Sequence, residues 1–455
     1  MQKSLWSLKD INDALDIKLK HCAENFRIII DSREEKKGDI FLALRGVKFN
    51  ANCFVNQAIQ SGAVLCISDD ISQVASSYYD KVIFVNDTKM TLIKLAKHRR
   101  SRIHGNVIAV TGSVGKSSVK QFLSSVMKYY GKSYVSRGNY NSQIGLPLSI
   151  ANAPIGCKYY IFELGMSEPG EMRIISNILS PNIGVILNIK EVHRQSFQNL
   201  DEIAKAKLEI IEGMPDKSIL ILNKEIKQSL YQKDVLKKNI NVRLFDYVKH
   251  CMLERIKLDC CYKKAYIRLY AKILVQEFSK DLGNHLIFNM QAVFLCLDIL
   301  KLDPAKAYNV FKKLKPIKGR GKVYYLSNNI ILIDESYNSS PVSLEAAISS
   351  SLVFKIKGRR FIAVIGDMLE LGDMEHSFHQ NVDLGGIDQL FCIGKIAKLL
   401  FNRAADKQRG GCFTSVNKLL QLLITSIKKN DIILVKGSNA LKLGLLVEKI
   451  KLLYV

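Results

Sequence analysis

The sequence has no run of 18 or more apolar residues, so we expect no segment that spans a membrane. Its ten cysteines include no C-x-x-C pair, which argues against a zinc knuckle or a disulfide framework and fits a reducing compartment. The opening stretch, MQKSLWSLKD, lacks the apolar core of a secretory signal. These absences predict a cytoplasmic protein with no integral membrane association.

Acidic residues are scarce relative to basic ones, 42 against 67, which gives a net charge of +25. Such an excess is compatible with a nucleic acid, an anionic membrane or anionic small substrates. The lysines are scattered through every segment rather than gathered into a tail or a stripe. We therefore favour a solvated lysine surface together with an anionic small substrate, and we expect no nucleic-acid partner.

The chain also lacks internal repeats and low-complexity linkers, so domain boundaries must come from changes of pattern. At 455 residues it is too long for one ordinary core. Residues 1–97 mix short strands and short helices, and residues 98–316 follow the strand, turn and helix rhythm of a parallel sheet. Alternating stretches in 217–275 predict antiparallel strands appended to that second domain. The α/β rhythm returns over residues 317–455.

The fold class predicted from these patterns is α/β with three domains. The first is a small N-terminal α/β domain. The second is a central P-loop domain with a parallel sheet and an antiparallel appendage, and the third is a C-terminal Rossmann-like domain.

The segment VIAVTGSVGKSSVKQF has the order of a buried strand, a glycine turn and a helix. Gly112 and Gly115 would let the backbone wrap a phosphate at the helix N-terminus. Lys116 would reach the terminal phosphates and the Ser117 hydroxyl would bind Mg²⁺. Val110 stands where the full eight-residue pattern has glycine. The residues expected to contact nucleotide here are Thr111, Gly112, Ser113, Val114, Gly115, Lys116, Ser117 and Ser118.

Polar residues follow two further apolar runs of the central segment. YYIF ends at Glu163, and IGVIL ends at Asn188, with His193 five residues later. Ligands of open parallel sheets lie beyond the carboxyl ends of the strands, so Glu163 and His193 are candidate Mg²⁺ ligands beside the phosphates. The plainer alternatives are a strand-end cap for Glu163 and an ordinary core or surface histidine for His193.

The segment LDEIAKAKLEIIEGM, residues 200–214, predicts a helix whose apolar face includes Ile203, Ala206 and Ile210. Lys207 falls on that face. A buried, unpaired ammonium is strongly disfavoured, so Lys207 should be paired, shifted in pKa or chemically modified. The alternative is that its stem packs while its charged end reaches water.

At this point the sequence resembles the Mur ligases, the ATP-dependent amide-forming enzymes of peptidoglycan precursor synthesis. The resemblance covers nearly the whole chain in the family's order. Its motifs are TGSVGKSSVK, GNYNSQIGLPLS, FELGMSEPGEM, LNIKEVH, AKAKLEI, LIDESYNSSP, GDMLELG and LVKGS. IDESYNSSP and GDMLELG are most similar to the family members that add D-alanyl-D-alanine.

The resemblance implies roles for single residues. Lys116, His193, Lys207 and Arg320 would be catalytic, and Ser117, Glu163, His193 and Lys207 would hold metal. Lys207 matches the family lysine that is carbamylated. Asn289, Arg320, Asp334 and Glu335 would contact the nucleotide. Substrate contacts would come from Ser32, Arg33, Asn139, Asn141, Tyr337, Asn338 and Lys436.

The function that the resemblance implies is an ADP-forming ligase with ATP and two Mg²⁺ ions, working as a monomer. It would bind the uridine substrate in its N-terminal domain, ATP in its central domain and the amine acceptor in its C-terminal domain. It would join D-alanyl-D-alanine to UDP-N-acetylmuramoyl-tripeptide, through an acyl phosphate, for cell-wall biogenesis, cell shape and cell division. Two alternatives are a related ligase, either a neighbouring muramyl step or a folylpolyglutamate synthase, and a non-catalytic nucleotide-binding protein.

Overall fold

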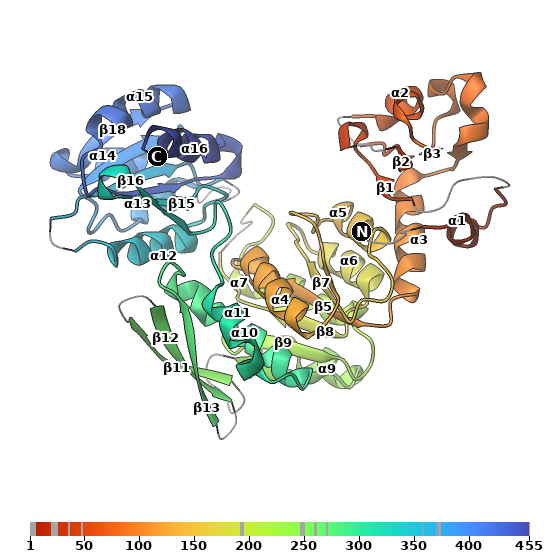
Figure 1. Cartoon of the computed structure of the whole chain (residues 1–455), viewed down its shortest axis with the longest axis horizontal. Helices are drawn as coiled ribbons and strands as arrows, with labels where there is room; N and C mark the ends of the chain where they lie inside the picture. The colour runs from red at the N-terminus through yellow and green to blue at the C-terminus, as the bar shows by residue number, and fades with distance from the viewer. Residues whose placement is uncertain are drawn as a thin grey trace.

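The computed structural model describes residues 6–19, 26–34, 37–46, 49–191, 195–245, 251–258, 262–269, 272–356, 358–369, 371 and 375–454. Its strands form four sheets in three regions of the chain (Figure 1). The predicted α/β class is confirmed, including the antiparallel appendage.

The central sheet is built from short strands whose side chains are buried on both faces, as parallel strands covered by helices require. Its strands are β5 (Asn106–Thr111), β6 (Ser133–Val135), β7 (Tyr159–Glu163), β8 (Ile183–Ile186), β9 (Ile219–Asn223) and β10 (Asn241–Phe245). They are all parallel, in the order β10-β9-β8-β5-β7-β6. β5 therefore lies between β7 and β8, which brings three predicted strand ends together.

Helices cover both faces of this sheet. They are α3 (Thr88–Ser101), α4 (Lys116–Tyr130), α5 (Gly145–Ala151), α6 (Glu171–Leu179), α7 (Leu200–Leu208), α8 (Ile210–Gly213), α9 (Gln232–Lys237), α10 (Asn284–Ile299) and α11 (Tyr308–Lys312). Ile108 and Val110 of β5 pack in one core with α4 and α10, while Val107 and Ala109 pack in the other with α6 and α7. This alternation is what a strand between two helical layers dictates.

The single helix predicted over 200–214 is divided at Glu209 into α7 and α8. The carboxylate of Glu209 accepts hydrogen bonds from the backbone N–H groups of Gly170 (3.0 Å) and Arg173 (3.2 Å), at the start of α6. A glutamate carboxylate at a helix N-terminus accepts hydrogen bonds from backbone N–H groups that have no acceptor within the helix. The apolar periodicity alone carries no sign of this contact.

The N-terminal region contains a four-stranded parallel sheet in the order β1-β2-β3-β4. Its elements are α1 (Leu8–Leu15), β1 (Ile28–Ile29), β2 (Ile40–Leu42), α2 (Val55–Ser61), β3 (Leu65–Ser68) and β4 (Val82–Phe84). Trp6 is fully buried and joins this region to the central one. Its Nε1–H donates to the carbonyl of Ala151 (2.8 Å). The Arg99 guanidinium stacks on its ring at 4.4 Å. His98 stacks on the same ring.

The C-terminal region contains a six-stranded sheet in which only the edge strand β14 is antiparallel. Its strands are β14 (Lys322–Leu326), β15 (Ile330–Glu335), β16 (Phe361–Gly366), β17 (Gln389–Ile393), β18 (Arg409–Phe413) and β19 (Ile432–Lys436). Its helices are α12 (Pro341–Leu352), α13 (Glu375–Asn381), α14 (Lys398–Arg403), α15 (Val416–Ser426) and α16 (Gly444–Leu453). The strand order is β14-β15-β19-β16-β17-β18.

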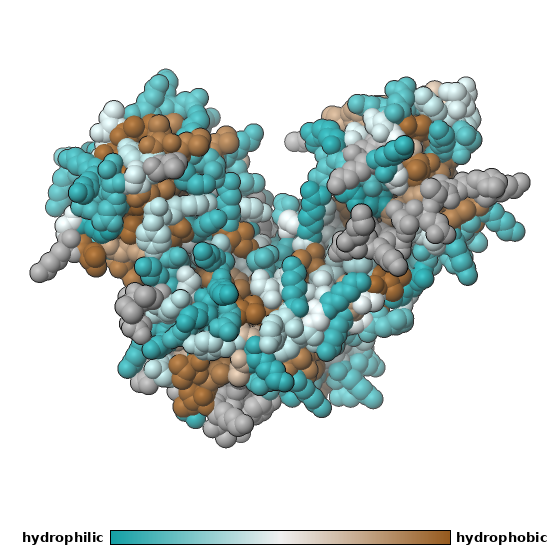
Figure 2. Space-filling view, viewed as in Figure 1, coloured by the Kyte–Doolittle hydropathy of each residue, from teal (hydrophilic) through white to brown (hydrophobic). Residues whose placement is uncertain are grey.

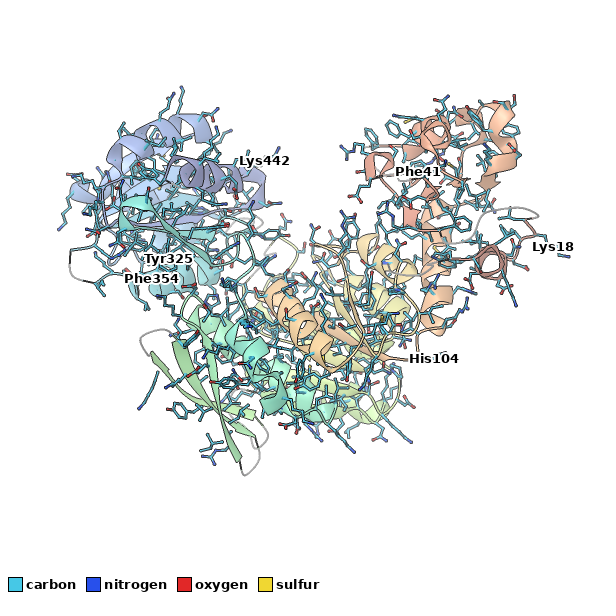
Figure 3. The ribbon with its side chains drawn as sticks, in the orientation of Figure 1. Lys18, Phe41, His104, Tyr325, Phe354 and Lys442 are labelled. Atoms are coloured by element: carbon cyan, nitrogen blue, oxygen red, sulfur yellow. The ribbon has the colours of Figure 1, made fainter. Side chains whose placement is uncertain are left out.

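The antiparallel sheet has three strands, β11 (Cys251–Leu258), β12 (Tyr262–Leu269) and β13 (Lys272–Ser279). The turn after β13 meets the C-terminal region, because the hydroxyl of Tyr325 donates to the carboxylate of Asp281 (2.5 Å; Figure 3 labels Tyr325). The N-terminal and C-terminal regions stand on opposite sides of the central one, and the surface is hollowed between them (Figure 2). No helix in the described part of the chain is both long and apolar enough to cross a membrane.

Candidate functional site

The glycine turn after β5 adopts a conformation that requires glycine. Gly115 has φ of 88°, and a Cβ there would lie 2.6 Å from Nδ2 of Asn289. The Nζ of Lys116 folds back over the turn and donates to the carbonyls of Gly112 (2.7 Å) and Ser113 (3.1 Å). α4 begins at Lys116, so its unpaired backbone N–H groups and helix dipole face the turn. The turn is therefore built to hold an anion such as a phosphate.

Asn188, at the end of β8, fixes this turn from the neighbouring strand. Its Oδ1 accepts from the N–H of Val114 and its Nδ2 donates to the carbonyl of Val114, both at 3.0 Å. The Ser113 hydroxyl also donates to the carbonyl of Lys190 (3.0 Å). The sequence identified Asn188 as a strand-end residue but gave it no role, since its contact depends on β8 lying beside β5.

Glu163 ends β7 and is almost fully buried beside α4. Its Oε2 accepts from the Ser117 hydroxyl (2.8 Å) and lies 3.3 Å from the Nζ of Lys120, while its Oε1 accepts from Asn141 (2.9 Å). Burial by itself would raise the pKa of Glu163, but the charges of Lys120 and Lys116 outweigh it, so the pKa lies below its ordinary value. The carboxylate is therefore ionised at neutral pH.

Ser117 and Glu163 fit a hard cation, since a hydroxyl and an ionised carboxylate are the oxygen donors that Mg²⁺ prefers. Within the described ranges no three His, Cys, Asp or Glu residues gather into a site of their own. A cation held by one or two protein oxygens and completed by phosphate oxygens agrees with that arrangement. His193, the other expected metal ligand, lies outside the described residues.

Lys120 was not singled out from the sequence. It is a buried lysine on α4, four residues after Lys116, and its Nζ also donates to the carbonyl of Gly138 (2.5 Å). Gly138 precedes Asn139 and Asn141, so this bond holds the segment that carries both asparagines against α4. The spacing of the two lysines was the sequence signal, because residues four apart share one helix face.

Lys207 is 1% exposed on α7, so the alternative in which its charged end reaches water is wrong. Burial, with a smaller contribution from the charge of Lys116, lowers the pKa of Lys207 well below its ordinary value. Among the described residues, the charge that acts on the pKa of Lys207 is that of Lys116 and not that of an acidic group. The side chain is therefore buried on α7, its lowered pKa favours the neutral amine, and it does not line the cavity.

A second group of predicted residues comes from the C-terminal region. The guanidinium of Arg320 stacks on the ring of Tyr337 at 3.9 Å. The Nζ of Lys436, which is 2% exposed, donates to the carbonyl of Asn338 (2.9 Å) and lies 3.4 Å from Oε2 of Glu335. Burial lowers the pKa of Lys436, and Glu335 opposes that change. Glu335 and Lys436 end β15 and β19, neighbouring strands whose carboxyl ends share one edge, and Tyr337 and Asn338 follow β15. Arg320 lies just before β14.

Both groups line one cavity of about 820 Å³ between the central and C-terminal regions. The predicted residues among its lining are Ser113, Val114, Gly115, Lys116, Ser118, Asn139, Asn141, Glu163, Asn289, Arg320, Glu335, Tyr337, Asn338 and Lys436. Side chains separated by more than 300 positions thus meet at a single site. Its basic residues and amide groups suit a polyanionic ligand.

Several predicted residues do not line this cavity. Thr111 is fully buried, with an Oγ1 that has no hydrogen-bond partner among the described residues. Asp334, expected to contact ribose, is buried and accepts from the N–H of Gly319 (2.8 Å) and the hydroxyl of Ser336 (2.6 Å). Its oxygens thus hold the turn that carries Arg320, and the ribose contact stays a prediction.

The expected uridine contacts, Ser32 and Arg33, lie in the N-terminal region and are absent from the cavity lining. The Arg33 guanidinium is largely exposed and pairs with Asp31 (2.7 Å). A nearby ion pair between Arg137 and Glu34 (2.8 Å) links this region to the segment that carries Asn139 and Asn141.

Comparisons with known proteins agree with this geometry. Residues 110–297 match the Mur ligase middle domain, and residues 319–439 match the Mur ligase, glutamate ligase domain. The UDP-N-acetylmuramoyl-tripeptide–D-alanyl-D-alanine ligase of Rickettsia prowazekii (strain Madrid E) is 30% identical over 454 residues, which cover 98% of this chain and 99% of that protein. The enzyme of the same name from Bacillus subtilis (strain 168) is 29% identical over 91% of each chain.

Solved structures show the same fold. MurF from Acinetobacter baumannii matches with a TM-score of 0.84 at 24% identity, covering 98% of each chain. MurF ligase from Thermotoga maritima, in complex with ADP, matches with a TM-score of 0.80 at 25% identity, over 93% of this chain and 97% of that one. Folylpolyglutamate synthase from Mycobacterium tuberculosis matches less closely, at a TM-score of 0.63 and 12% identity over 79% of this chain and 94% of that one.

These relatives correct one expectation about Lys207. A carbamylated lysine belongs to the ligases of the other muramyl steps and not to the D-alanyl-D-alanine-adding enzymes that match this chain. Without a carbamate, the buried amine of Lys207 offers no oxygen to Mg²⁺, so the metal-ligand role is withdrawn.

The phosphate turn, Glu163 and the basic side chains of Arg320 and Lys436 line one cavity. The matches to known proteins span nearly the whole sequence. The chain belongs to the Mur ligase family.

Proposed function

We propose that this chain joins UDP-N-acetylmuramoyl-tripeptide to D-alanyl-D-alanine and converts ATP to ADP and phosphate in the same reaction. The support is the name shared by the relatives that match it over more than 90% of its length. The observation that carries the proposal is the cavity, which places the phosphate turn opposite the C-terminal cluster of Arg320, Tyr337 and Lys436.

The first step activates a carboxylate, which is by itself a poor electrophile. An oxygen of the tripeptide carboxylate attacks the γ-phosphorus of ATP, ADP leaves, and an acyl phosphate forms. Lys116 and the backbone N–H groups at the start of α4 stabilise the negative charge on the transferring phosphoryl group. Arg320 lines the same cavity from the C-terminal side and adds positive charge there.

The second step forms the amide bond. The amine of the dipeptide attacks the acyl carbon and phosphate leaves, so the reaction needs the acceptor next to the acyl phosphate and away from water. We propose that Tyr337, Asn338 and Lys436 line the acceptor side, because they belong to the C-terminal wall of the cavity. Lys436 is held there by Asn338 and Glu335.

We propose that Mg²⁺ binds between Ser117 and Glu163, where it would neutralise phosphate charge. A second ion remains an expectation that depends on His193. We further propose that residues 1–97 bind the uridine diphosphate part of the donor, residues 98–316 bind ATP and residues 317–455 bind the acceptor. The protein would act as a monomer in the cytoplasm.

The test is a matrix of donors and acceptors with phosphate release as the readout. Release that requires ATP, the tripeptide donor and D-alanyl-D-alanine together is the expected result. Release with a single amino acid, or with folate and glutamate, would assign the chain to another member of the family. No release together with steeply salt-dependent binding to duplex DNA would instead support the non-catalytic alternative.

A further inference from the structure

The part of the GDMLELG motif that the structure describes after Gly366, residues 367–369 and 371, has no role in the reaction described above. It follows β16, and the side chains of Leu369 and Leu371 line the cavity. The other apolar lining on the C-terminal side comes from Val342 and Ala346 of α12. We call these four side chains, Val342, Ala346, Leu369 and Leu371, the apolar wall.

The backbone of this segment is fixed by three different elements. The N–H of Asp367 donates to the carbonyl of Ile393 at the end of β17 (3.1 Å). The N–H of Met368 donates to Nε2 of His379 on α13 (3.0 Å). The N–H of Leu369 donates to the hydroxyl of Ser438, just after β19 (2.9 Å). Three consecutive donors are thus satisfied by groups more than ten residues away.

His379 is fully buried and uses both ring nitrogens. Nδ1 lies 2.6 Å from the carbonyl of Glu375, to which it must donate, because Nε2 accepts from Met368. Only the neutral ring can make both bonds. Burial lowers the pKa of His379, against the opposing influence of the Glu375 carbonyl and Asp367, which keeps the ring neutral near pH 7.

The carboxylate of Asp367 connects the same segment to residues 395–397, just after β17. It accepts from the N–H groups of Lys395, Ile396 and Ala397, at 2.7 to 3.0 Å. A Cβ at Gly394 would lie 2.2 Å from this carboxylate, so that glycine is required by the close approach.

The wall is also tied to the acceptor side of the cavity. The N–H of Ser438 donates to the carbonyl of Asp367 (3.0 Å), and Ser438 lies two residues after Lys436. The position of Leu369 is therefore coupled to the strand end that carries Lys436, while no such bond connects it to the phosphate turn among the described residues.

We infer that the apolar wall selects the small side chains of the acceptor dipeptide, and that His379 is a positioning residue that places Leu369 in it. This inference rests on the proposed function, since the two methyl groups of D-alanyl-D-alanine are the apolar groups that the wall would receive. Leu369 contacts the substrate in this view, whereas His379 acts only through the backbone of Met368.

Variants of Leu369 and His379 test the two parts of the inference, the apolar wall and the positioning role of His379. Leu369→Ala widens the wall, and we expect the KM for D-alanyl-D-alanine to rise roughly tenfold, the effect of lost apolar contact in a substrate pocket. Discrimination against D-alanyl-D-valine should fall by a similar factor. The KM values for ATP and the donor should stay within about twofold. Leu422→Ala, on the exposed side of α15, is the matched control and should change none of these values.

His379→Leu removes the acceptor for the Met368 N–H, and we expect it to raise the dipeptide KM alone. His379→Gln offers an oxygen in its place and should recover most of the wild-type value. Uniform loss of activity with unchanged KM values, or equal defects in both His379 variants, would overturn the positioning role.

Unchanged dipeptide discrimination in Leu369→Ala, which alters a side chain at the cavity surface and should fold, would overturn the wall itself. A wild-type chain that releases no phosphate with the dipeptide would instead overturn the proposed function, and this inference with it.

Discussion

Glu163 shows how neighbouring charges decide the state of a buried group. Its surroundings are apolar enough to favour protonation, yet two lysines and the Ser117 hydroxyl keep it ionised. Lys207, on α7 of the same domain, is also buried, but among the described residues the charge that acts on it is that of Lys116, and its pKa lies well below the ordinary value. Both pKa values are therefore lowered, which favours the charged form of the carboxylate and the neutral form of the amine.

Glu163→Gln should lower kcat by about a hundredfold or more, because an amide neither holds a cation nor balances Lys120 and Lys116. Phosphate release at saturating ATP and Mg²⁺ measures the effect. Asp234→Asn, which removes an exposed carboxylate on α9, is the control and should be as active as the wild type. Near-normal activity of Glu163→Gln would contradict the metal site.

Lys207→Met should raise the free energy of unfolding by about 1–3 kcal/mol, since a thioether of similar length costs less to bury than an amine. The pKa of Lys207 is lowered on folding, so the wild type gains stability as pH rises towards the ordinary lysine pKa. The advantage of the variant should therefore shrink between pH 7 and pH 10. Urea unfolding at several pH values tests this, and a constant or growing advantage would contradict it.

At the scale of elements, the order of strands determines which residues meet. β5 lies between β7 and β8, so the phosphate turn receives Glu163 from one side and Asn188 from the other. The sequence predicted the turn and Glu163, because both are read from local patterns. It gave no role to Asn188 and overlooked Lys120, because their contacts depend on strand neighbours and on a bond to Gly138.

Other differences between the sequence-based expectations and the structure also come from contacts between segments that are distant in the sequence. The break at Glu209 comes from a contact with α6 that periodicity does not encode. The contacts of the Asp334 carboxylate with Gly319 and Ser336 were not predicted, because they depend on how the chain turns before β14 and after β15. Antiparallel strands were predicted over 217–275, and β11 to β13 confirm them for the later part of that stretch, where apolar and polar residues alternate. The earlier part of the prediction is wrong, because β9 and β10 are parallel strands of the central sheet.

Asn188→Ala should loosen the phosphate turn by removing both bonds to Val114. Two neutral hydrogen bonds contribute about 2 kcal/mol together, so we expect the KM for ATP to rise at least tenfold. Titration of ATP at fixed donor and dipeptide provides the measurement. Asn177→Ala, on the outer face of α6, serves as the control. An unaltered KM in Asn188→Ala would show that the turn holds its shape without β8.

At the scale of the whole molecule, the excess of 25 positive charges acts over distances longer than any single contact. ATP and the uridine diphosphate donor are anions, whereas the dipeptide is a zwitterion with no net charge. The positive electrostatic field should therefore raise the local concentration of ATP and of the donor near the protein, and leave that of the dipeptide unaffected.

Raising NaCl from about 50 mM to about 300 mM should increase the KM for ATP and for the donor by about threefold, because salt shortens the reach of surface charge. The KM for the dipeptide should stay constant. Measurements at constant free Mg²⁺ separate screening from metal competition. A parallel rise in all three KM values would point to a general effect of salt on the fold.

Trp6 gives this architecture a built-in optical reporter. It is the chain's one tryptophan, and it lies fully buried where the N-terminal region meets the central one, against Arg99 and His98. Intrinsic tryptophan fluorescence therefore reports on the contact between these two regions alone. A red shift that precedes the loss of circular dichroism would mark separation of the N-terminal region while the three sheets elsewhere stay folded.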